Sequence, residues 1–136
     1  MKKVIYIVCM CLCMCLLCSC SSSKNITIYE NCHGYTLGTE MESISLEQFI
    51  ALAKENEDAF AEKYAKDGIQ VVFVDKVKYL VDDLLIDLES GITIELHNPD
   101  DYFSEGKSYE FKGIVEMNSR EDYGFVIKPH LYSSVD

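Results

Sequence analysis

Basic residues are scarce in this sequence: it contains 12 Lys and Arg against 23 Asp and Glu, and its formal net charge at pH 7 is −11. So acidic a chain repels the phosphate backbones of nucleic acids and anionic lipid headgroups. Proline and glycine are also few, with two and seven residues, so we expect no elaborate active-site loops. The patterns G-x-S-x-G, H-E-x-x-H and the glycine-rich phosphate loop are missing. We therefore expect neither an enzyme nor a cofactor.

The one long apolar run lies at the start of the chain. Lys2 and Lys3 precede a continuous apolar stretch over residues 4–17, which is too short for a comfortable membrane span. A basic start followed by a short apolar core is typical of a secretory signal. We expect this signal to comprise residues 1–19.

The signal ends in the tetrapeptide Leu17-Cys18-Ser19-Cys20. It resembles the lipobox of bacterial lipoproteins, with Leu at −3, a small residue at −1 and Cys at +1, although Cys18 at −2 is less usual than Ala or Ser. The resemblance implies that the Cys20 thiol receives a diacylglycerol and that Cys20 then becomes the first mature residue. Two acyl chains hold a protein firmly to membrane lipid, here on the extracytoplasmic face of the cell membrane. A plain secretory signal or an uncleaved anchor is the alternative.

Cysteine is nearly absent from the rest of the chain. The five cysteines that would leave with the signal are Cys9, Cys11, Cys13, Cys15 and Cys18. With Cys20 blocked as a thioether, only Cys32 remains, so we expect no internal disulfide. Loss of Lys2 and Lys3 leaves 10 basic and 23 acidic residues, a net charge of −13. Such a charge favours cations, basic peptides or simply solubility.

Three consecutive strands over residues 69–96 form the centre of the remaining sequence. Asp82-Asp83 and Glu89-Ser90-Gly91 separate them as turns. Period-two alternation of β-branched and aromatic residues predicts strands with one buried face. The predicted inward positions are Ile69, Val71, Phe73, Val77, Tyr79, Leu84, Ile86, Leu88, Ile92, Ile94 and Leu96.

A helix is predicted before these strands, over residues 45–66. Ser45 and Gln48 form a capping box at its start, and Asn56 favours a kink because it can cap a second segment. Within residues 20–42, Ile26, Ile28 and Tyr29 could form a small strand, which Asn31, Gly34 and Gly38 would interrupt. We expect a lipidated tether there, followed by an irregular arm or hairpin.

Two further strands are predicted near the end of the chain. The fourth covers residues 109–117, with Gly113 on its inward face, and the fifth covers residues 123–131. Pro129 near the end of the fifth strand suits an edge position. Residues 133–136 are expected to fray.

A helix followed by five strands, with a loop between the third and fourth, is the order of a five-stranded Greek-key OB barrel with an N-terminal helix. The motifs that carry a resemblance are Glu55-Asn56-Glu57, Ala59, Lys63-Tyr64, Gly106-Lys107 and Gly113. With this order and spacing, residues 45–131 resemble the tRNA-anti-like OB-fold domain of small bacterial lipoproteins. The resemblance implies a mostly β domain over residues 43–136. It departs at Asp75, where the family has a glycine, so that either the bend lies elsewhere or Asp75 lies at a bulge with its carboxylate in water.

An OB barrel binds ligands on the outer face of its second and third strands. The residues of this candidate ligand face are Asp82, Asp83, Asp87, Thr93, Glu95 and His97. The face is acidic and almost without aromatic residues, whereas proteins that bind single-stranded nucleic acid need a cationic groove with stacking aromatics. We therefore expect no nucleic-acid partner.

The acidic residues of this face could instead bind a divalent cation, because Ca²⁺ prefers carboxylate oxygens. They do not match a D-x-D-x-D-G loop, and an ordinary acidic surface is the alternative. Cys32-His33 resembles half of a zinc site, but the other histidines, His97 and His130, are far apart in the sequence. We predict no metal site.

These patterns together predict a membrane-anchored, extracytoplasmic lipoprotein with one OB-fold domain. Its expected role is to bind a protein, a peptide or a small ligand at the cell envelope. An acidic envelope domain that binds divalent cations is the alternative. The expected attachment to membrane lipid is through Cys20.

Overall fold

The computed structural model describes residues 24–98, 102–118 and 124–135. The predicted signal and Cys20 lie outside these ranges. In chain order, the described elements are β1 (Asn25–Glu30), β2 (Thr39–Ser45), α2 (Leu46–Glu55), α3 (Glu57–Tyr64), β3 (Gln70–Leu80), β4 (Leu85–Leu88), β5 (Thr93–Glu95), β6 (Ser108–Met117) and β7 (Phe125–Ser134).

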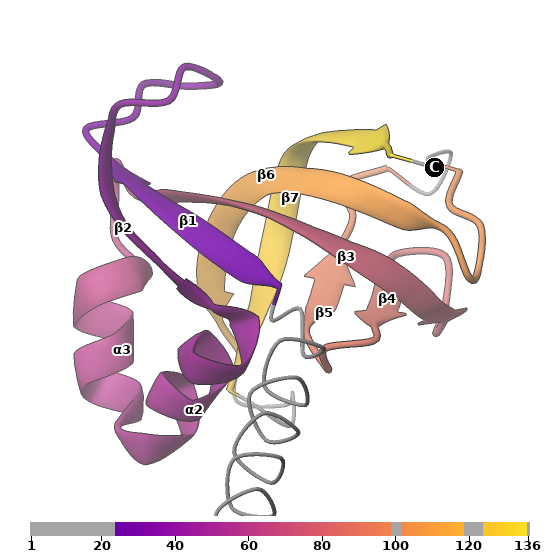
Figure 1. Cartoon of the computed structure of the whole chain (residues 1–136), viewed down its shortest axis with the longest axis horizontal. Coiled ribbons are helices and arrows are strands. Elements are labelled where there is room, and N and C mark those ends of the chain that lie inside the picture. The colour runs from indigo at the N-terminus through magenta and orange to yellow at the C-terminus, as the bar shows by residue number, and fades with distance from the viewer. Residues whose placement is uncertain (1–23, 99–101, 119–123, 136) are drawn as a thin grey trace, which may run out of the picture.

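Five of the strands close into a barrel, in the order β3-β4-β5-β7-β6 and back to β3 (Figure 1). The pairings are antiparallel except for β5 with β7, which run parallel. The prediction of a mostly β chain with a five-stranded barrel is thereby confirmed at this level. The architecture is consistent with an OB-like barrel.

The predicted alternation fills the barrel with apolar side chains, including Phe73, Phe111 and Ile127, which are at most 2% exposed. Two predicted inward positions are exceptions, since Tyr79 is 44% exposed and Leu84 is 40% exposed. The β3–β4 register shifts between Val77 and Tyr79. A shift of this kind interrupts the strict alternation from which the inward face was predicted.

The predicted single helix is divided into α2 and α3 at Asn56. The Ser45 hydroxyl accepts a hydrogen bond from the Gln48 amide at 3.1 Å and caps α2. Asn56 has extended backbone angles, and its side-chain oxygen accepts from the Ala59 amide at 3.0 Å to cap α3. The predicted kink is confirmed as a full break. The two helices lie together at one side of the barrel, near β1 and β2 (Figure 1).

Residues 25–45 form the hairpin β1–β2, and within residues 20–42 we had expected a tether followed by an irregular arm or a hairpin. The arm is not irregular, because β1 joins the barrel sheet by antiparallel pairing with β3, Ile26 lying opposite Phe73. Ile26 and Ile28 are completely buried in the same apolar cluster as the barrel and the helices. The sequence indicated a possible small strand here, but so short a pattern does not predict that the strand pairs with β3.

The last strand, β7, extends further than predicted. Pro129 lies within it, opposite Gly113 of β6, and Ser133 and Ser134 pair with Glu110 and Tyr109. The expected frayed tail at residues 133–136 is therefore wrong for its first two residues. A register shift between Lys112 and Gly113 accommodates the proline, as is usual at bulges.

Candidate functional site

β1 and β4 share one edge of β3. β1 and β6 both pair with residues 71–73 of β3, so they must lie on opposite edges of that strand. In the closed barrel, β4 and β6 are likewise the two neighbours of β3 on its opposite edges. β1 reaches Phe73, and β4 begins its pairing at Val77. Residues 74–76 of β3 therefore lie between the end of one neighbour and the start of the next.

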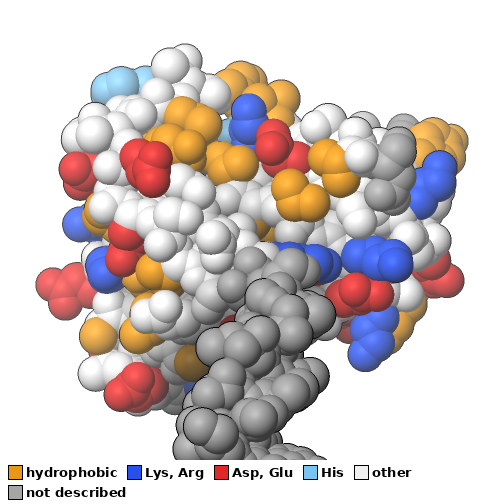
Figure 2. All heavy atoms as spheres, in the orientation of Figure 1, with side chains coloured by type: hydrophobic (Ala, Val, Ile, Leu, Met, Phe, Trp, Pro, Cys, Tyr) orange, Lys and Arg blue, Asp and Glu red, His pale blue; other side chains and the backbone are white. Residues whose placement is uncertain are grey.

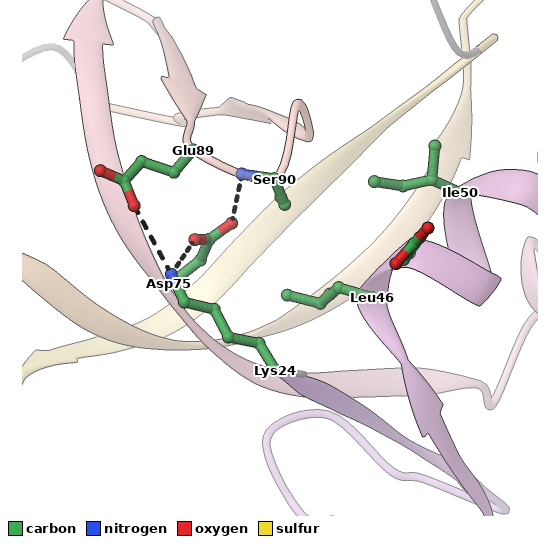
Figure 3. Close-up of a pocket in the computed structure, with 7 residues that line it drawn as sticks. Lys24, Leu46, Ile50, Asp75, Glu89 and Ser90 are labelled. Carbon is green, nitrogen blue, oxygen red and sulfur yellow. Dashed lines mark hydrogen bonds and ion pairs between the residues drawn. The ribbon is translucent and has the colours of Figure 1, made fainter. Parts of the chain in front are cut away.

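Asp75 occupies the middle of this gap, and its side chain is completely buried. The carboxylate accepts hydrogen bonds from the Lys24 ammonium at 2.7 Å, from the Lys76 amide at 2.8 Å and from the Ser90 amide at 3.2 Å. Of the two alternatives for Asp75, the one that places its carboxylate in water is thus wrong. Asp75 has the inward parity of β3, and Lys24 with the turn after β4 closes the gap over it (Figure 3).

Lys24 directly precedes β1 and links it to the helices. Its carbonyl accepts from the Leu46 amide at 2.8 Å, and its ammonium lies 3.9 Å from a carboxylate oxygen of Glu89. A buried carboxylate is costly unless it is paired and hydrogen-bonded. Lys24 therefore supplies the positively charged partner that a carboxylate buried in this position requires.

A cavity of about 390 Å³ adjoins this ion pair, between the barrel and α2. We call it the Asp75 cavity; it is lined by Lys24, Leu46, Glu47, Ile50, Asp75, Glu89 and Ser90. Leu46 and Ile50 of α2 face the polar group of Lys24, Asp75 and Ser90 across the open space (Figure 3). The volume lies at the lower end of the range for small-ligand sites, roughly 300–1,000 Å³. An apolar wall opposite a few fixed polar groups is the usual construction of such a site.

Sequence reasoning missed this cavity. From the sequence, Asp75 was considered as a departure from a glycine and as one of many possible catalytic carboxylates, and Lys24 was assigned to the tether. The available signal was one acid at an inward position of a strand, between the buried residues Phe73 and Val77.

The residues of the candidate ligand face lie on the neighbouring strands β4 and β5 and in the segments that flank these strands. Asp82 accepts from the amides of Leu84 and Leu85, both at 2.8 Å, and thereby holds the turn between β3 and β4. Asp83 and His97 are exposed. The turn prediction at Asp82-Asp83 is confirmed. The Asp82 carboxylate oxygen stabilises this turn through hydrogen bonds to backbone amides.

The strand residues of this face also have protein partners. Thr93 is buried and donates to the Asp87 carboxylate at 2.8 Å. Glu95 lies 3.5 Å from the Lys128 ammonium, which also contacts Glu116 at 2.8 Å. These contacts reduce the negative charge that β4 and β5 offer to a ligand. On the face seen in Figure 2, too, basic side chains lie among acidic ones.

Within residues 24–98, 102–118 and 124–135, no group of three or more His, Cys, Asp or Glu could hold a metal ion. Cys32 is buried, and its sulfur accepts from the Gly38 amide at 3.3 Å. The neighbouring His33 forms an isolated bridge with Thr36. Cys32 and His33 thus contribute to the bend between β1 and β2.

Comparisons of the chain with protein-family models, with curated proteins and with solved structures found no match. Among the helices that the structure describes, none has the length and apolar character of a transmembrane span.

Proposed function

We propose that this chain is an extracytoplasmic lipoprotein whose OB-fold domain binds a small ligand at the cell envelope. Acyl chains on Cys20 would hold it to the membrane. The barrel order, in which β7 lies between β5 and β6, supports assignment to the Greek-key OB fold. The lipobox-like tetrapeptide before Lys24 supports the anchor.

The observation that carries the binding role is the Asp75 cavity. It combines a buried, hydrogen-bonded carboxylate with an apolar wall, and it has the volume of a small-ligand site. Function depends on such a site rather than on the fold, because OB folds serve many roles. Of the ligand types expected from the sequence, the cavity favours a small molecule over a folded protein.

The divalent-cation alternative has less support. Asp82, Asp87 and Glu95 already interact with amides, a hydroxyl and an ammonium of the protein. A hard cation such as Ca²⁺ needs about six to eight oxygen ligands. The carboxylates of this face would have to abandon their present partners to supply them.

One preparation tests both halves of the proposal. The full chain is expressed in a bacterium with a labelled fatty acid, recovered from membranes in detergent and measured by native mass spectrometry. We expect the fatty-acid label on the protein and a small-molecule adduct in the spectrum. Cys20→Ala removes the label and membrane retention but keeps the adduct, because the cavity lies in the folded domain.

Ile50→Trp is the reciprocal variant, since an indole at this position fills the Asp75 cavity. It keeps the label and loses the adduct. Cys18→Ala is the matched control for the anchor and changes neither result. Label on Cys20→Ala would contradict the anchor, and an unchanged adduct on Ile50→Trp would contradict the binding site.

A further inference from the structure

We propose that the Asp75 cavity takes a small ligand with a primary ammonium group on a short apolar chain, and that Lys24 is its internal substitute. This inference rests on the proposed function, because it names the ligand class of the same site. Lys24 places an ammonium on a completely buried carboxylate in the wall of this cavity. The protein itself therefore shows which group the carboxylate accepts.

The charge of the lining favours a cation. Asp75, Glu47 and Glu89 contribute three carboxylates to the cavity, against the single ammonium of Lys24. The only other ammonium recorded within 4.0 Å of these carboxylates, among the described residues, belongs to Lys76 and lies 4.0 Å from Glu89. A cavity with this balance, in a chain of net charge −11, attracts positive ligands and repels anionic ones.

The carboxylate of Asp75 is fixed in place, while Lys24 is free to leave. The backbone amides of Lys76 and Ser90 hold the two oxygens of Asp75 within β3 and the following turn. The Lys24 side chain is 42% exposed and carries its charge on a flexible stem, so it can move into solvent. A ligand ammonium that replaces it keeps the buried carboxylate paired, and the exchange leaves no uncompensated charge.

The geometry also selects the kind of ammonium. The Lys24 nitrogen donates to Asp75 at 2.7 Å, a length typical of charge-assisted hydrogen bonds. A quaternary ammonium has no N–H and cannot make this contact. Leu46 and Ile50 lie across the cavity, where a short carbon chain attached to the ammonium would contact them.

The test is a titration of the full, isotope-labelled chain in detergent, followed through the amide signals of Lys76 and Ser90. The probe is n-butylammonium, and the comparison compounds are n-butanol, butyrate and tetramethylammonium at matched salt. We expect saturable shifts with n-butylammonium alone. Asp75→Asn should abolish them, and Lys78→Ala, which removes one charge from β3 outside the cavity, should leave the midpoint unchanged.

Lys24→Ala removes the internal competitor, so n-butylammonium should bind this variant at least about tenfold more tightly and raise its Tm. If Lys24→Ala does not fold, the titration of the wild-type chain with n-butylammonium and the comparison compounds tests the ammonium assignment. Equal shifts with butanol or butyrate would overturn the ammonium assignment and leave the cavity as a binding site. No saturable shift with any probe would overturn this inference and the proposed binding site together.

Discussion

His130 of β7 is a partly buried polar residue outside the Asp75 cavity. Its ring nitrogen Nε2 is buried and has no hydrogen-bond partner among the described residues. Its ring lies 5.2 Å from that of Tyr35. Burial lowers the pKa of His130, and the nearby His97 and Lys112 lower it further. The folded protein therefore favours the neutral imidazole.

This lowered pKa predicts a pH-dependent stability. The unfolded chain binds a proton on His130 below about pH 6.5, whereas the folded chain binds it only at lower pH. The free energy of unfolding should therefore rise with pH across the window between the lowered pKa and about 6.5. His130→Gln should flatten this rise in urea unfolding measured between about pH 5 and about pH 8. Leu131→Ala, an exposed neighbour, is the control, and an unchanged slope in His130→Gln would contradict the assignment.

Which residues could be predicted from the sequence depends on how far away their partners lie. The caps at Ser45 and Asn56 bind amides three residues ahead, so the local sequence contains the whole interaction. Asp75 takes its hydrogen bonds from Lys24 and Ser90, 51 and 15 positions away. No local pattern predicts such contacts, and the candidate site was missed for that reason.

Among the elements, the five barrel strands could be predicted from their alternation, whereas the place of β1 in the sheet and the β3–β4 register could not. β3 and β6 were identified because each contains ten or more residues with sustained alternation. β1 has only six residues, and its position in the sheet depends on pairing with β3, which follows both helices in the sequence. The β3–β4 register shift is likewise set by two strands together, which explains the wrong placement of Tyr79.

The contact between β6 and β7 depends on Gly113. A Cβ at this position would lie 2.3 Å from the Lys128 carbonyl oxygen and 2.7 Å from the Pro129 Cα. Both are backbone atoms that cannot turn aside. We expect Gly113→Ala to lower the free energy of unfolding by about 1–3 kcal/mol or more, as overpacking does. Urea unfolding measures this.

The matched control for this change is the neighbouring Ile114→Ala, where the side chain is 42% exposed. A surface change of this kind usually alters stability by about 0.5 kcal/mol or less. A Gly113→Ala variant as stable as the control would contradict the close backbone contact between β6 and β7 at this position.

At the scale of the whole molecule, the barrel, the helices and the β1–β2 hairpin share one apolar core. Phe49 of α2 packs against Phe60 of α3 and Phe125 of β7, with ring centroids 5.0 Å and 5.6 Å apart. Ile26 and Ile28 of β1 belong to the same cluster. The sequence alone predicted the five barrel strands but placed this hairpin outside the domain, because its burial arises only when the core is assembled.

A shared core predicts that damage to β1 unfolds the barrel. Ile28→Ala removes a completely buried side chain and should cost about 2–5 kcal/mol in the free energy of unfolding. Far-UV circular dichroism and tyrosine fluorescence should show the same lowered urea midpoint. Thr27→Ala, on the opposite face of β1, should shift it far less. A barrel midpoint unaffected by Ile28→Ala would show that the hairpin is a separate appendage.

Lys24 belongs both to the wall of the Asp75 cavity and to the segment just before β1, only four residues after Cys20. Four extended residues span at most about 14 Å. Acylation of Cys20 would thus keep the mouth of this cavity in the water layer next to the lipid headgroups. Molecules that travel in the plane of the bilayer would then reach it by a two-dimensional search, and molecules from bulk solution by a three-dimensional one.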